Sequence, residues 1–220
     1  MFEHLLLPSH SKLNDIILKT EYENDKRVYV SPEGNRYKSI TSLLSNLNKA
    51  AIQKWRANVG EKEANRISTK ASRRGTCLHS LCEKYIKNEE LTLTNELPHV
   101  VELFLTIKPF LNQINNVHLV EGTVWSDELG VAGRVDLIAE FAGKLSVVDY
   151  KTSSKNKTWK MCDRFFLQGT FYAKAYEEVT GIPVEQVVIL IAVENNEPLL
   201  YVENRDSWLE PLKEVINKYN

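Results

Sequence analysis

Three strand-type segments separated only by short turns most constrain the fold of this chain. They are VHLVEGTVW at 117–125, GRVDLIAEF at 133–141 and KLSVVDYKT at 144–152. Each is rich in β-branched and other apolar residues and shows strand-type rather than helical periodicity. Because the intervening turns SDELGVAG and AGK are short, the sequence predicts three antiparallel neighbours in one sheet.

Helix-type periodicity precedes and follows these strands. The segment RVYVSPEGNRYKSI is typical of a hairpin, and Thr41 is expected to cap a short helix that continues to Leu47. A second helix holds Ile52 and Trp55, and a third, longer one begins after Gly60. Further helices are predicted over residues 99–114, 163–180 and 208–219, with a strand pair at 186–194 and 198–203.

This order predicts an α/β (α+β) fold, with a mixed central β-sheet flanked by helices and a helical N-terminal part. With 220 residues and 43% hydrophobic content, the chain is expected to form a single domain over residues 1–220. Its N-terminal hairpin and helical region, at about 1–115, would cover a core at about 116–220.

Charge and cysteine content argue against several classes of protein. A net charge of −1 gives no overall attraction to nucleic acids or membranes, so any basic site must be local. Cys77, Cys82 and Cys162 lack CxxC pairing, which disfavours a disulfide framework or a closed zinc site and favours a reducing, intracellular setting. No window reaches membrane-spanning length and no secretion signal is evident, so we expect a protein that is not secreted.

The third strand ends with two charged residues, Asp149 and Lys151. Residues two apart on a strand face the same way, so these two side chains can converge on one point. The hairpin brings the preceding strand, with Asp136, alongside. Two close carboxylates repel unless a cation lies between them, and hard oxygen ligands favour Mg²⁺ or Mn²⁺. A plain salt bridge, or a strand that runs out into solvent, is the alternative interpretation.

These residues resemble the PD-(D/E)XK nuclease superfamily, whose metal site combines an Asp on one strand with a D/E-x-K pair on the next. GRVD supplies Asp136, and DYK supplies Asp149 and Lys151. The segments RGTCLHSLCEKY, LQGTFY and VEGTVWSDELGVAGRVD resemble motifs of the RecB-like branch and span roughly residues 73–176. Within that branch the chain looks most like the mitochondrial genome maintenance exonucleases and phage-encoded relatives, which act on single-stranded DNA.

The resemblance implies a restriction-endonuclease-like fold and roles for particular residues. Asp136 and Asp149 would bind Mg²⁺ or Mn²⁺, and Lys151 would be catalytic. The Tyr150 carbonyl is implied as a further ligand, with His79 at the metal or the scissile phosphate. On the helix that follows, Gln168 and Tyr172 would border the site and contact DNA or brace the lysine.

Two departures from relatives matter. Asp149 stands where many relatives carry Glu, which shortens one ligand. Relatives with an iron–sulfur cluster carry four cysteines, three of them close together near the C-terminus, whereas this chain has only Cys162 there, so no cluster is expected. Glu121, on the first strand, could bind a second metal, bind DNA or pair with a Lys or Arg.

Two basic clusters flank the predicted site. Such rows are usually solvated faces, but against a phosphate backbone they guide the strand electrostatically. Trp159 is the best candidate for base stacking, whereas Trp55 and Trp125 are expected in the core. The first cluster holds Lys62, Arg66, Lys70, Arg73 and Arg74, and the second holds Lys155, Lys157, Lys160 and Arg164.

The expected function is a metal-dependent DNA exonuclease that prefers single strands or DNA ends, acting in replication, recombination or repair. The expected setting is the cytoplasm of a bacterial or phage-infected cell. Three alternatives stay open: a structure-specific or flap endonuclease of the same fold, a non-catalytic DNA-binding module, and a different hydrolase that uses acids and a lysine.

Overall fold

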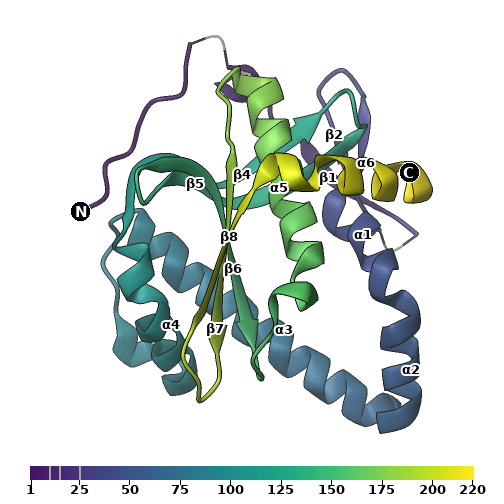
Figure 1. Ribbon diagram of the computed structural model, residues 1–220, viewed down its shortest axis with the longest axis vertical. Helices are drawn as coiled ribbons and strands as arrows, with labels where there is room; N and C mark the ends of the chain where they lie inside the picture. The colour runs from purple at the N-terminus through teal and green to yellow at the C-terminus, as the bar shows by residue number, and fades with distance from the viewer. Residues whose placement is uncertain (10, 15, 25) are drawn as a thin grey trace.

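The computed structural model describes residues 1–9, 11–14, 16–24 and 26–220, and these form an eight-stranded mixed sheet with helices on both faces (Figure 1). The strands are β1 (Lys19–Glu23), β2 (Lys26–Val30), β3 (Arg36–Ser39), β4 (Ile114–Ser126), β5 (Val131–Phe141), β6 (Lys144–Ser153), β7 (Gln186–Val193) and β8 (Leu199–Asn204). The helices are α1 (Ile40–Ser45), α2 (Lys49–Val59), α3 (Glu61–Ile86), α4 (Pro98–Leu111), α5 (Asp163–Thr180) and α6 (Leu209–Tyr219). The predicted mixed sheet flanked by helices is confirmed.

The central strands pair as their short turns predict. Strands β4, β5 and β6 form an antiparallel meander. Strand β7 then lies parallel to β6, because α5 carries the chain back across the sheet before β7 begins. Strand β8 pairs antiparallel with β7 at one end of the sheet.

One edge of β5 is shared between two strands, which leaves a fork in the sheet. At its start, β5 pairs in parallel with β3 through Val131 and Ala132. Its antiparallel pairing with β6 begins only at Leu137. Residues 133–136 lie between these two ladders, with β4 on their other side. The fork therefore exposes a short stretch of central strand to side chains from the helices.

The two faces of the sheet are covered by different helices (Figure 1). Helices α3 and α4 pack one face through a core that includes Leu78, Phe104 and Ile107. Helices α1, α5 and α6 pack the other face through a core that includes Phe171 and Tyr176. Apolar stripes at helical spacing on α3 and α5 explain this arrangement, since each buries one face against strands. Helix α2 has no buried residue and lies to one side of the sheet.

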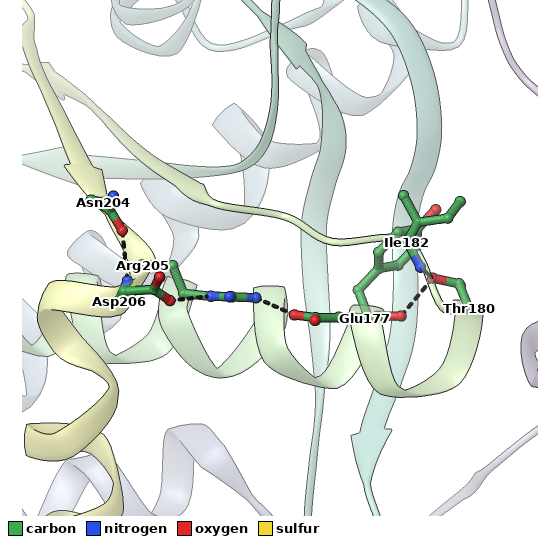
Figure 2. A network of polar contacts seen from close by, with 7 residues as sticks. Glu177, Thr180, Ile182, Asn204, Arg205 and Asp206 are labelled. Carbon is green, nitrogen blue, oxygen red and sulfur yellow. Dashed lines mark hydrogen bonds and ion pairs between the residues drawn. The ribbon is translucent and has the colours of Figure 1, made fainter.

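The C-terminal end of α5 is fixed by polar contacts (Figure 2). Arg205 forms ion pairs with Glu177 on α5 and with Asp206. The Asn204 side chain accepts a hydrogen bond from the Asp206 backbone N–H at 2.8 Å. Gly181 ends the helix in the left-handed conformation, with φ of 75°. These contacts anchor the helix that carries Gln168.

Several element boundaries differ from the predictions. Helix α1 begins at Ile40 after Ser39 rather than being capped by Thr41. Helix α4 ends at Leu111, and Ile114 already belongs to β4. Strand β1 was not predicted, because its residues KTEYE are all exposed and show no apolar alternation. In the part of the chain that the structure describes, no helix is both long and apolar enough to cross a membrane.

Candidate active site

Three carboxylates on three adjacent strands occupy the same level of the sheet. Strands β4 and β5 pair Val120 with Leu137 and Gly122 with Val135, so Glu121 lies opposite Asp136. The β5–β6 ladder ends at Leu137 and Val148, so the next position on each strand is Asp136 and Asp149. We call Glu121, Asp136 and Asp149 the acidic row. It lies at the fork, where β5 has no ladder partner in β3 or β6.

Asp136 is held by two hydrogen-bonding groups. Its Oδ2 accepts a hydrogen bond from the Tyr150 backbone N–H at 2.9 Å. Its Oδ1 lies 3.4 Å from Nδ1 of His79, which α3 places over the fork. The other ring nitrogen of His79, Nε2, donates to the Tyr150 carbonyl at 2.7 Å. The imidazole thereby bridges the strand that carries Asp149 and the strand that carries Asp136.

Asp149 is buried and short of hydrogen-bond donors. Its side chain is 1% exposed and forms an ion pair with Lys151 Nζ. Within the described residues the Lys151 ammonium is the one group paired with Oδ2, and Oδ1 has no hydrogen-bond partner. A buried carboxylate oxygen without a donor is costly unless a cation meets it.

The protonation equilibria at the acidic row reflect this crowding. Burial raises the pKa of Asp149 to about 6, with Lys151 opposing and Asp136 adding to the shift. Burial also acts on Asp136, but the charge and hydrogen bond of His79 outweigh it and lower the pKa of that carboxyl. Burial would lower the pKa of His79, yet the neighbouring Asp136 raises it overall. Burial and Asp136 together raise the pKa of Glu121.

The donor set fits a divalent cation. One ligand atom each from His79, Glu121 and Asp136 can be chosen so that all lie within 4.8 Å of one another. The donor-poor oxygens of Asp149 belong to the same row. Carboxylate oxygens suit hard cations and an imidazole nitrogen suits borderline ones, so this set indicates a divalent metal ion. The Tyr150 carbonyl, predicted as a further ligand, is engaged with His79.

Glu121 reaches this cluster through an unusual backbone conformation. Its φ of 51° is positive, which is uncommon for a residue other than glycine within a strand. Its Oε2 lies 2.7 Å from Arg134 Nε. The sequence left several roles open for Glu121. The structure shows it paired with an arginine, and its carboxylate also belongs to the group of residues that could hold a metal ion.

Gln168 and Tyr172 lie one turn apart on α5, but only Gln168 reaches the site. Gln168 lines a cavity of about 390 Å³ together with Lys151 and His79. Its Nε2 donates to the Tyr172 hydroxyl at 2.9 Å. Tyr172 is 1% exposed, so its predicted contact with DNA is corrected: the ring packs in the core and positions the glutamine.

Gly133 is a structural residue of the site that the sequence analysis did not single out. A Cβ at Gly133 would lie 2.7 Å from Tyr172 Cε1 and 2.7 Å from Ile40 Cγ2. Only glycine therefore allows α1 and α5 to approach the fork so closely. The sequence feature that could have indicated this role is the position of Gly133 in GRVD, three residues before Asp136.

Most of the first predicted basic cluster lies on an open surface of α3. Arg66, Lys70 and Arg73 are exposed and line a groove of about 650 Å³ between α3 and the start of α4. The prediction that Arg74 contacts DNA is wrong, because its side chain is 6% exposed and its Nη1 lies 2.7 Å from Glu194 Oε1. That ion pair ties α3 to the end of β7 instead of presenting a charge to a ligand.

The second basic cluster lies on the loop that follows β6. Lys155 and Lys160 are exposed and Lys157 is partly buried. Trp159 is 42% exposed, and its Nε1 donates to Glu203 at 2.5 Å. The predicted core position of Trp125 is confirmed at 2% exposure, whereas Trp55 is only partly buried on α2.

Two known proteins resemble part of this chain. Mitochondrial genome maintenance exonuclease 1 of Mus musculus is 26% identical over 110 residues, which are 48% of this chain and 32% of that protein. The protein of the same name from Homo sapiens is 25% identical over 126 residues, 54% of this chain and 34% of that protein. The chain thus matches about a third of the length of these relatives.

A solved structure and a family model complete the comparison. The crystal structure of a candidate exonuclease from Eubacterium rectale is 14% identical, with a TM-score of 0.45, and the match covers 68% of each chain. A TM-score of that size supports no assignment by itself. The family model matches residues 50–219, which include every member of the acidic row. The chain belongs to the PD-(D/E)XK nuclease superfamily.

Proposed function

We propose that this protein is a divalent-metal-dependent DNA exonuclease that hydrolyses phosphodiester bonds and prefers single strands or DNA ends. The observation that carries the proposal is the acidic row at the fork of the sheet, with His79 above it and Lys151 beside it. A nuclease of this superfamily needs such a cluster to hold a cation against a phosphate.

The proposed ligands are Asp136 and Asp149, joined by His79, Glu121 and the Tyr150 carbonyl. A bound Mg²⁺ or Mn²⁺ would supply Lewis-acid stabilisation of the phosphate and of the attacking water. The protein's own part begins with Asp136, which the Tyr150 N–H and His79 hold in place. A preorganised carboxylate costs no rearrangement when the cation and substrate arrive.

Lys151 is proposed as the catalytic cation. Its Nζ contacts Asp149 and also lies 5.2 Å from the centroid of the Phe165 ring, which limits its positions. An ammonium held there can donate hydrogen bonds to the attacking water or to the charge that grows on the phosphate. Gln168, held by its bond to Tyr172, would orient a substrate atom in the same cavity.

Features outside the acidic row support single-stranded DNA as the substrate. Arg66, Lys70 and Arg73 line a groove along α3, the helix that also carries His79. Lys155, Lys157 and Lys160 lie after the strand that carries Lys151. Trp159 exposes part of its ring beside them, which suits stacking on an unpaired base. The relatives named exonucleases match 110 and 126 residues of their sequences.

The proposal extends to cellular context. The 1–220 chain would act as one nuclease domain in DNA replication, recombination or repair, in the cytoplasm of a bacterial or phage-infected cell. This part rests on the sequence resemblance to exonucleases of genome maintenance and of phages.

The test uses DNA labelled at the 5′ or 3′ end, as single strands, duplexes and closed single-stranded circles, with Mg²⁺, Mn²⁺ or EDTA. An exonuclease releases label from linear strands only with metal and leaves circles intact. Cleaved circles would instead indicate an endonuclease of the same fold. Binding without turnover in either metal would indicate a non-catalytic DNA-binding module.

A further inference from the structure

A cavity between α1, α3, α5 and the end of β6 lies beside the acidic row, because two of its lining residues, His79 and Lys151, contact Asp136 and Asp149. Its volume is about 390 Å³, and its lining includes Lys151 from β6, His79 from α3, and Arg164 and Gln168 from α5. Thr41 of α1 adds a hydroxyl group. We call this the α1–α5 cavity. Its lining offers cations and neutral polar groups, and within the described residues no Asp or Glu.

Arg164 is the unexplained member of this lining. It lies one helical turn before Gln168 and is partly buried. In the described part of the chain no carboxylate forms an ion pair with it. Its guanidinium carbon lies 5.8 Å from the centroid of the Phe165 ring, and burial lowers the pKa of the group. Desolvating an arginine without an anion is unfavourable, so the position calls for a negatively charged partner.

The neighbouring cation sharpens this point. Lys151 Nζ lies 5.2 Å from the centroid of the same Phe165 ring. Two positive groups therefore contact one aromatic ring at the edge of one cavity. Asp149 neutralises Lys151, whereas nothing comparable neutralises Arg164. The cavity has one positive charge in excess, beside the place where the proposed reaction needs a phosphate.

We propose that Arg164 binds a phosphate group of the substrate strand next to the phosphate that is cleaved. The proposal rests on the proposed nuclease function and deepens it by assigning a phosphate subsite to the α1–α5 cavity. A guanidinium can hold two non-bridging oxygens at once, which would fix the register of the strand. The phosphate is either an internal diester or a terminal monoester, and these share the same chemistry.

The first experiment measures the salt dependence of binding to a fluorescent single-stranded oligonucleotide in EDTA, which prevents metal-dependent cleavage. Arg164→Gln should weaken binding about tenfold and reduce the slope of log K against log salt by about 0.7, the value for one phosphate contact on a single strand. Lys174→Gln, a charge removal on the same helix outside the cavity, is the matched control. Arg164→Lys should keep the slope, because it keeps the charge.

The second experiment locates the phosphate. Neutral methylphosphonates replace the phosphates of the oligonucleotide one at a time, and a parallel set carries a 5′-phosphate, a 3′-phosphate or free hydroxyls. A methylphosphonate at one position of the oligonucleotide should weaken binding to the unmodified protein but should not weaken binding to Arg164→Gln. An internal position identifies a diester contact, and a terminal one identifies a monoester contact.

The outcomes separate this inference from the proposed function. An unchanged salt slope in Arg164→Gln, with cleavage by the unmodified protein, overturns the phosphate subsite alone. The absence of any position whose penalty disappears in Arg164→Gln overturns it too. Failure of the unmodified protein to bind in EDTA, together with no cleavage in Mg²⁺ or Mn²⁺, overturns both proposals. If Arg164→Gln lowers Tm, the salt slope and the methylphosphonate scan of Arg164→Met, which removes the charge but keeps an apolar stem beside Phe165, decide.

Discussion

The backbone N–H of Tyr150 donates a hydrogen bond to Oδ2 of Asp136 at 2.9 Å. The regular ladder between β5 and β6 ends at Leu137 and Val148, so the Asp136 carboxylate takes a donor that a backbone carbonyl would otherwise satisfy. This contact ties an acid on one strand to the strand that carries Asp149 and Lys151. The fork in the sheet and the proposed metal centre are thus one feature of the structure.

Asp136→Asn tests the charge of this contact while preserving its shape. The amide oxygen can still accept from Tyr150, but the site loses one negative charge, so Mn²⁺ affinity should fall at least tenfold, equivalent to about 1.4 kcal/mol. Excess Mn²⁺ should restore part of the cleavage. Isothermal titration with Mn²⁺ measures the change, with Glu140→Gln on the same strand as a control. Unchanged affinity would remove Asp136 from the ligand set.

Lys151→Ala tests the catalytic cation. Removing a group that acts on developing charge typically slows a reaction by about 10²–10³-fold, while binding of the ground state changes little. Single-turnover cleavage and fluorescence anisotropy with single-stranded DNA measure the two effects separately. Lys144→Ala, at the exposed start of the same strand, should leave both unchanged. A full cleavage rate in Lys151→Ala would exclude the assigned role.

The raised pKa of Asp149 predicts how metal binding responds to pH. With a pKa of about 6, Asp149 binds a proton that must leave before a cation can bind. Mn²⁺ affinity should therefore be nearly constant above pH 7 and fall by up to about tenfold per pH unit below pH 6. In Asp149→Asn the Mn²⁺ affinity should depend less on pH and should be lower than that of the unmodified protein at every pH. An identical pH profile in that variant would show that another group controls binding.

Gly133→Ala tests the close approach of α1 and α5 to the fork. Its added Cβ would lie 2.7 Å from both Ile40 and Tyr172, and overpacking of this kind costs about 1–3 kcal/mol. Gly75→Ala is the matched control, because a Cβ there meets only Thr152 Oγ1 at 3.9 Å. That helical substitution should leave stability equal or higher. Urea denaturation compares the two, and equal midpoints would contradict the packing assigned to Gly133.

Local sequence patterns carried most of the fold and the centre of the site. The helix predicted over 163–180 coincides with α5, because Gly181 gives a clear end signal after a continuous apolar stripe. The meander followed from short turns, and the convergence of Asp136 with Asp149 followed from the meander. Each of these predictions depends on residues that are near one another in the chain.

Features that depend on distant contacts were not predictable in this way. The parallel pairing of β3 with β5, which creates the fork, joins residues 38–39 to 131–132 across the intervening helices. Arg74 looked like part of an exposed row, but its partner Glu194 comes from the far end of β7. Tyr172 lies one helical turn after Gln168, as a site residue would, but its ring is buried in the core. Helical spacing predicts which residues share one face of a helix. It does not predict what that face packs against, because the tertiary fold decides this.

The most direct test of the metal centre is the position of Mn²⁺ in crystals soaked with that ion, located by its anomalous scattering. The proposed site predicts a peak within bonding distance of carboxylate oxygens from both Asp136 and Asp149, with His79 or Glu121 adjacent. A peak elsewhere, or an acidic row that binds no ion while the crystals bind Mn²⁺ at other positions, would contradict it.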